Sequence, residues 1–383
     1  MMETQTTFYG PRLREARQAR ALKANALSEL IDVSPSSISQ YESGKQIPSP
    51  YVIAKLSNVL NLPAHFFTDP PEPPMSNCLR WRSQSAATKA ARERSEQKYE
   101  WFRRVIRFIE RHVDFPRSSF FDIGMPNDPL KITHDDIEHA AEQVRCAWGL
   151  KNGPISHTVQ LVENNGGIIV RSEMGDDCLD SFSDFDTASG RCYIILGTDK
   201  DSAVRSRHDV GHELAHVFLH RSVQMSVARQ SAVHKEMEAQ ADRFASALLM
   251  PSTSFPLEVF SFSLDGLLHL KRRWGVSISS MIMRLHDLDL IDDAKKQSLF
   301  IQLSRRRWRR REPLDNEIVS EQPKLLRRSI DALMSEGMLD TEQVVLDTHL
   351  PMLEIERLLG LEARYMSGKQ GDGEAPFELR LSN

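Results

Sequence analysis

The chain has 383 residues, enough for roughly two or three domains with a sizeable buried core. Its formal net charge of −4 argues against a protein coated in basic charge for general nucleic-acid binding, although it does not exclude a local DNA-reading surface. The cysteines follow no C-x-x-C spacing, which favours reduced thiols in the cytoplasm over a disulfide framework: Cys78, Cys146, Cys178 and Cys192. Because no apolar run is long enough to span a bilayer, we expect a soluble cytoplasmic protein without a membrane partner.

Short helical patterns separated by turn signals fill the first part of the chain. They predict helices over residues 11–21, 27–32, 35–43 and 50–60. Ser34 is suited to cap the third helix, with Pro35 at its first helical position, and Gly44 should end it. The pattern predicts a small all-α domain over residues 1–69.

Part of this domain resembles the lambda-repressor-like, XRE-type helix-turn-helix family. The resemblance is carried by Val33-Ser34-Pro35-Ser36-Ser37-Ile38-Ser39-Gln40-Tyr41-Glu42-Ser43-Gly44-Lys45 and then by Pro48-Ser49. In that family the second helix of the motif lies in the major groove of DNA. The resemblance implies that a polar set contacts DNA: Ser36, Ser37, Gln40 and Lys45.

Residue chemistry agrees with this implication, since glutamine is suited to reading adenine and serine to bonding a phosphate or a base. Ile38 and Tyr41 would pack inward. Two positions differ from the family pattern: Ala24 stands where a glutamine is usual, and Asp32 replaces the turn glycine, although aspartate tolerates a left-handed backbone. The alternative is a small helical bundle that serves protein contacts only.

A proline-rich stretch over residues 70–74 predicts a stiff linker and a boundary. A long helical pattern follows over residues 87–113. Basic residues crowd its first half and favour a solvated face, with phosphate contacts as the alternative: Lys89, Arg92, Arg94 and Lys98. We assign residues 70–116 to a linker and a connecting helix.

The next stretch mixes helices with strands. Residues 133–148 predict a helix capped by Thr133, and residues 155–164 predict another. Apolar runs then predict strands over residues 166–172, 179–183 and 191–197. Helices followed by a small sheet are typical of an α+β domain.

The chemistry of the chain centres on the H-E-x-x-H pattern at residues 212–216. Residues four apart share one face of a helix, so His212 and His216 could hold one metal ion, while Glu213 could reach a water molecule beside it. The alternative is a core helix with two incidental histidines. His220 and His234 are interpreted as structural or surface residues, with an oxyanion-stabilising role left open for one of them.

A catalytic zinc takes three protein ligands and keeps one open position. The helix predicted over residues 235–250 offers Glu238 as the third ligand. Asp242, one turn further on, could accept the free ring N–H of a ligand histidine and so orient the ring. Glu236 is the rival ligand, but it lies two residues from Glu238 and therefore faces elsewhere on the helix.

Residues 130–260 resemble the ImmA/IrrE family of metallopeptidases. The resemblance is carried by Arg205-Ser206-Arg207-His208-Asp209-Val210-Gly211-His212-Glu213-Leu214-Ala215-His216, by the run E-x-x-A-D-x-F-A-x-x-L-L-M-P over residues 238–251, and by the upstream Gly153-Pro154-Ile155 and Asp180-Ser181-Phe182-Ser183. It implies a zincin-like core, Glu238 as the third ligand, and proteolysis of a partner, often a DNA-binding repressor. His208 stands where the family commonly has phenylalanine.

Residues 261–383 predict a helical C-terminal region with a disordered polar tail from about residue 367. Residues 274–290 resemble the helical extension that commonly follows this peptidase core. Residues 305–311, R-R-R-W-R-R-R, form the most basic run of the chain. This run could bind DNA phosphates or an acidic partner, or it could be a solvated connector anchored by Trp308.

The predicted fold is therefore multidomain. An all-α helix-turn-helix domain precedes an α+β, zincin-like metallopeptidase domain over residues 117–260, which carries a helical C-terminal extension. Its predicted cofactor is one zinc ion on His212, His216 and Glu238, although another divalent metal also fits these ligands. Glu213 is the predicted catalytic base, with Asp242 behind the ligands.

The leading functional hypothesis is a transcription regulator that binds a double-stranded DNA operator as a homodimer. Its zinc-dependent endopeptidase domain would cleave a repressor, a toxin–antitoxin partner or the chain itself. The alternative is a non-catalytic repressor or antitoxin whose peptidase-like domain senses a metal or binds a partner.

Overall fold

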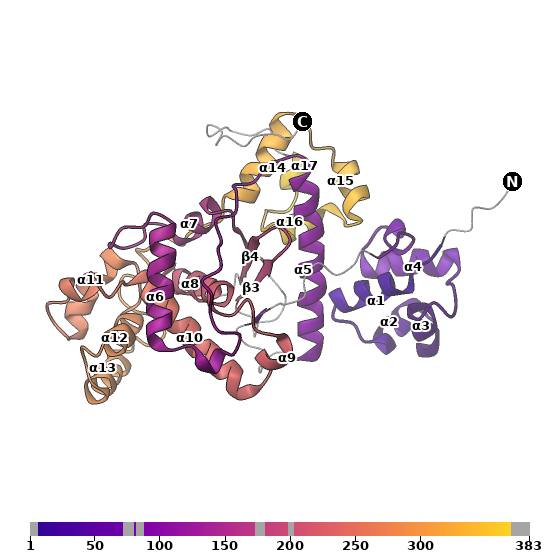
Figure 1. Cartoon of the computed structure of the whole chain (residues 1–383). Coiled ribbons are helices and arrows are strands. Elements are labelled where there is room, and N and C mark those ends of the chain that lie inside the picture. Colours follow the sequence, from indigo (N-terminus) through magenta and orange to yellow (C-terminus); the bar gives the residue numbers. More distant parts are fainter. Residues whose placement is uncertain (1–6, 72–79, 82–87, 173–180, 198–202, 369–383) are drawn as a thin grey trace.

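The structure is a computed structural model that describes residues 7–71, 80–81, 88–172, 181–197 and 203–368. Parts of several predictions lie outside these ranges: prolines 73 and 74 of the linker, Cys78, Cys178, the start of the strand predicted at residue 179, and the tail from residue 369. Helices predominate in the described part, around one small sheet (Figure 1). None of the described helices is long and apolar enough to cross a membrane.

The N-terminal domain contains the predicted helices with closely similar bounds: α1 (Gly10–Ala19), α2 (Ala24–Ile31), α3 (Pro35–Glu42), α4 (Pro50–Leu60) and the short 3-10 helix η1 (Ala64–Phe67). Ser34 caps α3, since its hydroxyl accepts a hydrogen bond from the backbone N–H of Ser37 at 3.1 Å. Asp32 adopts the left-handed conformation that the family's glycine provides, with φ of 59°. Ile38 and Tyr41 are buried, as predicted.

Helix α5 (Lys89–Glu110) lies between the N-terminal domain and the sheet (Figure 1). On one side, Trp101 Nε1 donates to Glu15 Oε1 of α1 at 2.6 Å. On the other side, the Tyr99 hydroxyl donates to Asp184 Oδ2 at 2.7 Å in a buried contact. The predicted solvated face is wrong for Lys98, which is buried, and burial lowers the pKa of its amine.

The sheet has four strands in the order β1-β3-β4-β2: β1 (Arg80–Trp81), β2 (Ile168–Arg171), β3 (Ser181–Asp186) and β4 (Arg191–Leu196). Strand β2 pairs with β4 in parallel, and the other pairs are antiparallel. Alternate residues of β2 and β4 join two different cores, which explains why these strands are continuously apolar. The short strand β1 was not predicted.

The remaining elements of the α+β part are η2 (Pro129–Lys131), α6 (His134–Ala147), α7 (Thr158–Asn164), α8 (Ala203–Leu219), α9 (Met225–Ala228), α10 (Ser231–Leu249) and η3 (Phe255–Glu258). Helix α8 lies on the face of the sheet away from α5 and packs against α6, α7 and α10 (Figure 1). A capping box of Thr133 and Asp136 begins α6, as the acidic first turn predicted. Helix α10 packs along α8 and also contacts α6.

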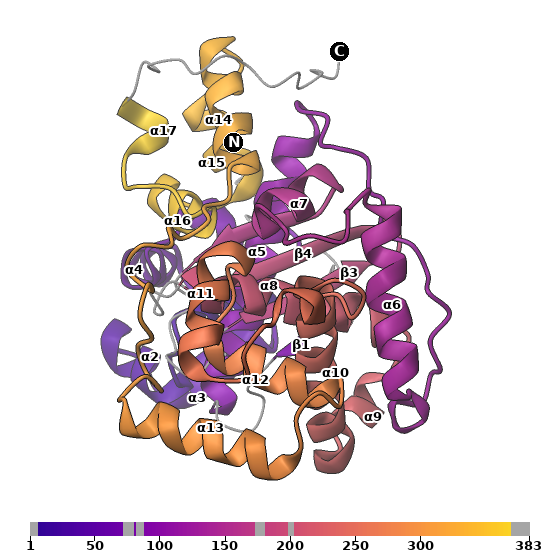
Figure 2. The ribbon, with the colours of Figure 1, turned by 90° about the vertical axis from the view of Figure 1, so that its left-hand side faces the viewer.

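The C-terminal region divides between two hydrophobic cores (Figures 1 and 2). Helices α11 (Leu264–Trp274), α12 (Ile278–Asp287) and α13 (Asp293–Arg305) pack into the core that contains α8 and α10. Helices α14 (Leu325–Ser335), α15 (Thr341–Thr348), α16 (Met352–Leu358) and α17 (Tyr365–Gly368) belong to the core of the N-terminal domain and α5. An ion pair of 2.7 Å between Arg20 and Glu354 joins α1 to α16 directly.

Helices α8 and α10 lie close together at Gly211, where an added Cβ would lie 3.1 Å from the Cβ of Ala245. We expect Gly211→Val to lower the free energy of unfolding by about 1–3 kcal/mol, because its extra methyl groups overpack this contact. Urea denaturation measures the change. Gly153→Ala is the matched control, since no atom lies within 4 Å of its added Cβ. Equal midpoints for Gly211→Val and the parent would contradict the close helix contact.

Candidate metal centre and nucleic-acid interface

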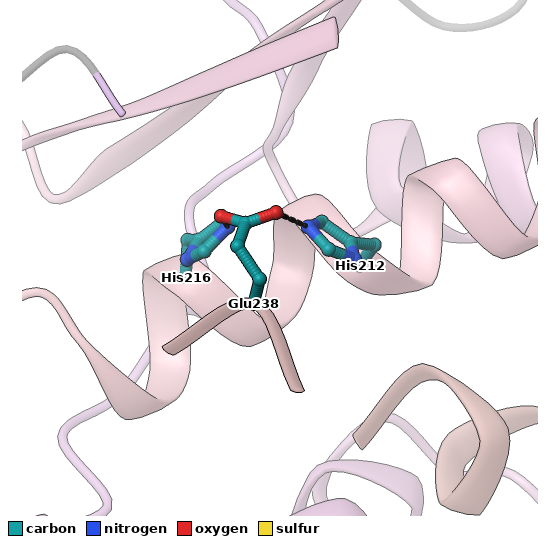
Figure 3. A group of neighbouring side chains, drawn as sticks. All are labelled: His212, His216 and Glu238. Atoms are coloured by element: carbon teal, nitrogen blue, oxygen red, sulfur yellow. Dashed lines mark ion pairs between the residues drawn. The ribbon is translucent and has the colours of Figure 1, made fainter. Parts of the chain in front are cut away.

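Helix α8 carries both histidines of the H-E-x-x-H pattern on one buried face. It lies between the sheet and α10, and His212 and His216 are almost fully buried. The small residues Gly211 and Ala245 let α10 approach this helix. Close approach brings the carboxylate of Glu238, on α10, to the two imidazole rings (Figure 3).

Three ligand-type side chains meet at this point (Figure 3). Glu238 Oε2 lies 3.3 Å from His212 Nε2, and Glu238 Oε1 lies 3.4 Å from His216 Nε2. The donor atoms lie within 4.8 Å of one another, and the described residues contain no other cluster of three such ligands. Two imidazoles and one carboxylate match the three protein ligands of a catalytic zinc site, which keeps a fourth position for water or substrate.

The charge states of the cluster also suit a cation. Burial raises the pKa of Glu238, but hydrogen bonds and charge interactions with His212 and His216 outweigh it, so the net pKa lies well below the usual range of a carboxyl group. Burial lowers the pKa of His216 despite the nearby Glu238. An ionised carboxylate and a neutral imidazole are the forms that bind metal ions.

Both histidines have hydrogen-bond partners for their Nδ1 atoms, which turns their Nε2 atoms toward Glu238. His212 Nδ1 lies 2.8 Å from Asp242 Oδ1, the contact that the helical spacing suggested. His216 Nδ1 lies 3.0 Å from His220 Nδ1, in a buried pair. Hydrogen bonds of this kind select the tautomer of a ligand histidine and orient its ring.

His220 belongs to a buried hydrogen-bonded chain that starts at His216 and that the sequence did not predict. Its Nε2 lies 2.9 Å from Gln240 Oε1, and Gln240 Nε2 donates to the carbonyl of Pro129 at 2.8 Å. Both ring nitrogens therefore lie against other side chains, in a residue with no exposed surface, which favours the structural interpretation of His220. The sequence feature that could have indicated this role of His220 is its spacing, since it is the third histidine at intervals of four residues after His212 and His216.

The rival ligand Glu236 does not join the cluster, although its Oε1 accepts a hydrogen bond from Gln240 Nε2 at 3.2 Å. His234, one turn before Glu238, has its Nδ1 3.8 Å from Glu238 Oε1 and is partly exposed. It therefore borders the cluster without being a member of it.

Glu213 is fully buried beside the cluster and is positioned by β3. Ser181 Oγ donates to Glu213 Oε1 at 2.6 Å, and Ser183 Oγ donates to the backbone carbonyl of Glu213 at 3.3 Å. Glu213 Oε2 has no hydrogen-bond partner among the described residues. A buried carboxylate held by one oxygen and open at the other can accept a proton. The role of Ser181 was not predicted from the sequence.

The candidate DNA-contacting residues lie on α3 and the turn that follows it. Ser36, Gln40 and Lys45 are exposed, whereas Ser37 is half-buried. The hydroxyls of Ser36 and Ser37 each lie 2.8 Å from Ser34 Oγ. The exposed face of α3 is therefore polar and uncharged, and a base-reading role for it stays a prediction.

Replacing either Glu236 or Glu238 by glutamine tests which of the two glutamates is a metal ligand. We expect Glu238→Gln to lose most of the bound zinc, because an amide replaces the charged ligand, and Glu236→Gln to retain it. Metal analysis of purified protein after dialysis measures both. Circular dichroism shows whether each variant is folded. Zinc retained by Glu238→Gln but lost from Glu236→Gln would reverse the assignment.

Two family models match the chain. Residues 13–67 match the model described as helix-turn-helix, and residues 167–286 match the model described as the IrrE N-terminal-like domain, of peptidase family M78. No curated protein matches the chain. The matched ranges contain α2 and α3 in one case and the H-E-x-x-H helix with Glu238 in the other, so both family resemblances are confirmed. The chain joins an N-terminal XRE-type helix-turn-helix domain to an ImmA/IrrE-like domain of the M78 peptidases.

Proposed function

We propose that the protein is a DNA-binding transcription regulator whose second domain is a zinc-dependent endopeptidase. Its substrate would be a protein partner such as a repressor or an antitoxin, or the chain itself. The observation that carries this proposal is the buried cluster of His212, His216 and Glu238 with Glu213 beside it. A purely structural helix has no need for two buried histidines directed at one carboxylate.

The residues present fit a zinc ion, which His212, His216 and Glu238 would hold. When bound, zinc would polarise the scissile carbonyl and lower the pKa of a water molecule. Asp242 and His220 would hold the two ligand rings in the tautomer that leaves Nε2 free to bind. The small spread of the donor atoms means that little rearrangement is needed to bind a cation.

Glu213 would act as the general base and then as the general acid. Its Oε2 atom would accept a proton from the attacking water and deliver it to the leaving amine. The hydrogen bond from Ser181 to Oε1 would keep this carboxylate in one orientation through both transfers. The metal ligands and the general base are thus each assigned to a side chain of this protein.

The helix-turn-helix match supports DNA binding by the first domain. In the proposed mode, the N-terminal part of α3 enters the major groove of an operator, with Gln40 directed at a base edge and Lys45 at a phosphate. A homodimer would read two half-sites, as is usual for this motif. Cleavage of a repressor by the second domain would then couple proteolysis to gene control.

We expect Glu213→Gln to bind zinc and fold like the parent protein but to lose cleavage by about 10²–10⁴-fold, because the amide cannot accept the proton. The measurement is co-expression of each form with candidate repressors and antitoxins, followed by mass spectrometry of fragments. A tagged Glu213→Gln copy of this chain serves as the test substrate for self-cleavage in trans.

Equal cleavage by Glu213→Gln and the parent would refute the assigned mechanism. If the parent protein binds zinc stoichiometrically but cleaves neither a partner nor itself, the metal-sensing alternative is favoured instead. His216→Ala, which removes a ligand, separates loss of metal from loss of the base.

We expect Gln40→Ala to weaken operator binding about tenfold, because a glutamine–adenine contact provides about 1–3 kcal/mol of discrimination. Binding to unrelated duplexes should change little. Lys45→Ala should instead weaken binding to the operator and to unrelated duplexes alike. It should also reduce the salt dependence of DNA binding, as loss of a phosphate contact does. The operator is first selected from random duplexes with the parent protein, and titrations at two salt concentrations then compare the variants. If Gln40→Ala and Lys45→Ala both bind DNA like the parent protein, the result would favour a helix-turn-helix domain that serves protein contacts only.

A further inference from the structure

A groove of about 1670 Å³ lies beside the metal centre. On the side of the centre, its lining includes Ala239 and Asp242, the residue that hydrogen-bonds to His212. The segment between α13 and α14 also contributes to the lining, through residues 309–312, 315, 316 and 318–320. The volume exceeds the roughly 300–1,000 Å³ of small-molecule sites, so the groove suits a polypeptide segment better.

Several acidic side chains of the groove are engaged within the protein. Glu138 Oε2 accepts a hydrogen bond from Arg284 at 2.8 Å, and Glu312 accepts one from Lys271 at 2.7 Å. Asp287 lies 3.4 Å from Arg243. The exposed acids of the lining are Asp135, Asp242 and Asp289, and Asp242 is hydrogen-bonded to His212.

Three consecutive arginines of the lining, Arg309, Arg310 and Arg311, are exposed and have no carboxylate partner among the described residues. Arg311 hydrogen-bonds to the neutral side chain of Asn316. Positive charge is therefore concentrated on one short segment of the groove, where it is available to an incoming carboxylate.

The segment that carries these arginines is held at both ends. On one side, Trp308 packs partly buried against the core, with the Arg306 guanidinium 4.8 Å from its ring centroid. On the other side, buried Glu312 accepts a hydrogen bond from the backbone N–H of Ile278 at 2.8 Å, at the start of α12. The predicted anchor at Trp308 is confirmed, and the arginines extend from a fixed backbone.

The location of the basic run disfavours a role in DNA binding. The run begins at the end of α13, and Figure 1 shows α13 and the DNA-reading helix α3 at opposite ends of the molecule. The same run borders the groove whose lining includes Asp242, the hydrogen-bond partner of His212. Its position thus relates it to the peptidase and not to the helix-turn-helix.

We propose that this groove binds an acidic, extended segment of the protein substrate and that Arg309, Arg310 and Arg311 pair with its carboxylates. The proposal rests on the proposed peptidase function and names the chemistry of its substrate. Complementary charge of this kind raises the association rate and selects partners, and salt screens it.

The test uses the zinc-loaded, full-length Glu213→Gln protein, so that binding is measured without cleavage. The probe is a fluorescein-labelled peptide of about twelve residues in which glutamate alternates with glycine, and its glutamine analogue is the neutral control. Arg309→Glu with Arg310→Glu is compared with Arg305→Glu and Arg307→Glu, a pair with the same charge change in exposed residues that do not line the groove.

We expect the groove pair to bind the acidic peptide at least about tenfold more weakly at low salt and the control pair to bind it like the parent. The proposal would be overturned if the groove pair and the control pair bound the acidic peptide with equal affinity. It would also be overturned if the parent protein did not bind the acidic peptide. A loss of duplex DNA binding in the groove pair with unchanged peptide binding would overturn it as well. Because the readout needs no cleavage, arginine-dependent peptide binding together with no cleavage of any partner or of itself by the parent protein would count against the proposed peptidase and leave the groove as a docking surface.

Discussion

The contact between α8 and α10 determines whether this chain has a metal centre. His212 and His216 come from one helix and Glu238 from the other, and the three donor groups meet because Gly211 and Ala245 lack bulk between the helices. A shift of one helix along the other would separate the carboxylate from both rings. The sheet on one side and α6 on another hold the pair in place, so the surrounding core maintains the geometry on which the chemistry depends.

Buried polar contacts then specify the state of each residue at the centre. Asp242 and His220 bind the far sides of the ligand rings, and Ser181 binds the near oxygen of Glu213. Each contact satisfies a polar atom that burial would otherwise leave unpaired at a considerable cost. The donor atoms of the three ligand-type side chains lie within 4.8 Å of one another, which is the arrangement that preorganised sites require.

Much of this could be predicted from the sequence, because periodic patterns and caps are local signals. The two domains follow from family patterns and the strands from apolar runs. The pairing of His212 with His216 follows from their spacing on one helix, and Glu238 follows from the pattern of the second helix. Contacts between distant segments were not predictable in the same way. Ser181 lies 32 residues from Glu213, and strand β1 comprises two residues with no periodicity of their own. For the same reason the hydrophobic pattern of the C-terminal helices did not predict which of the two cores each helix joins.

Helix α5 changes how the two domains should be regarded. The proline-rich stretch predicted a stiff linker and a boundary between two units, yet α5 buries side chains against both the helix-turn-helix domain and the sheet, and Arg20, directly after α1, pairs with Glu354 of α16. Helix α5 therefore connects the two domains through a shared hydrophobic core. If the first domain binds an operator as proposed, α5, which packs against both the helix-turn-helix domain and the sheet, would set the orientation of the candidate metal centre relative to the DNA axis.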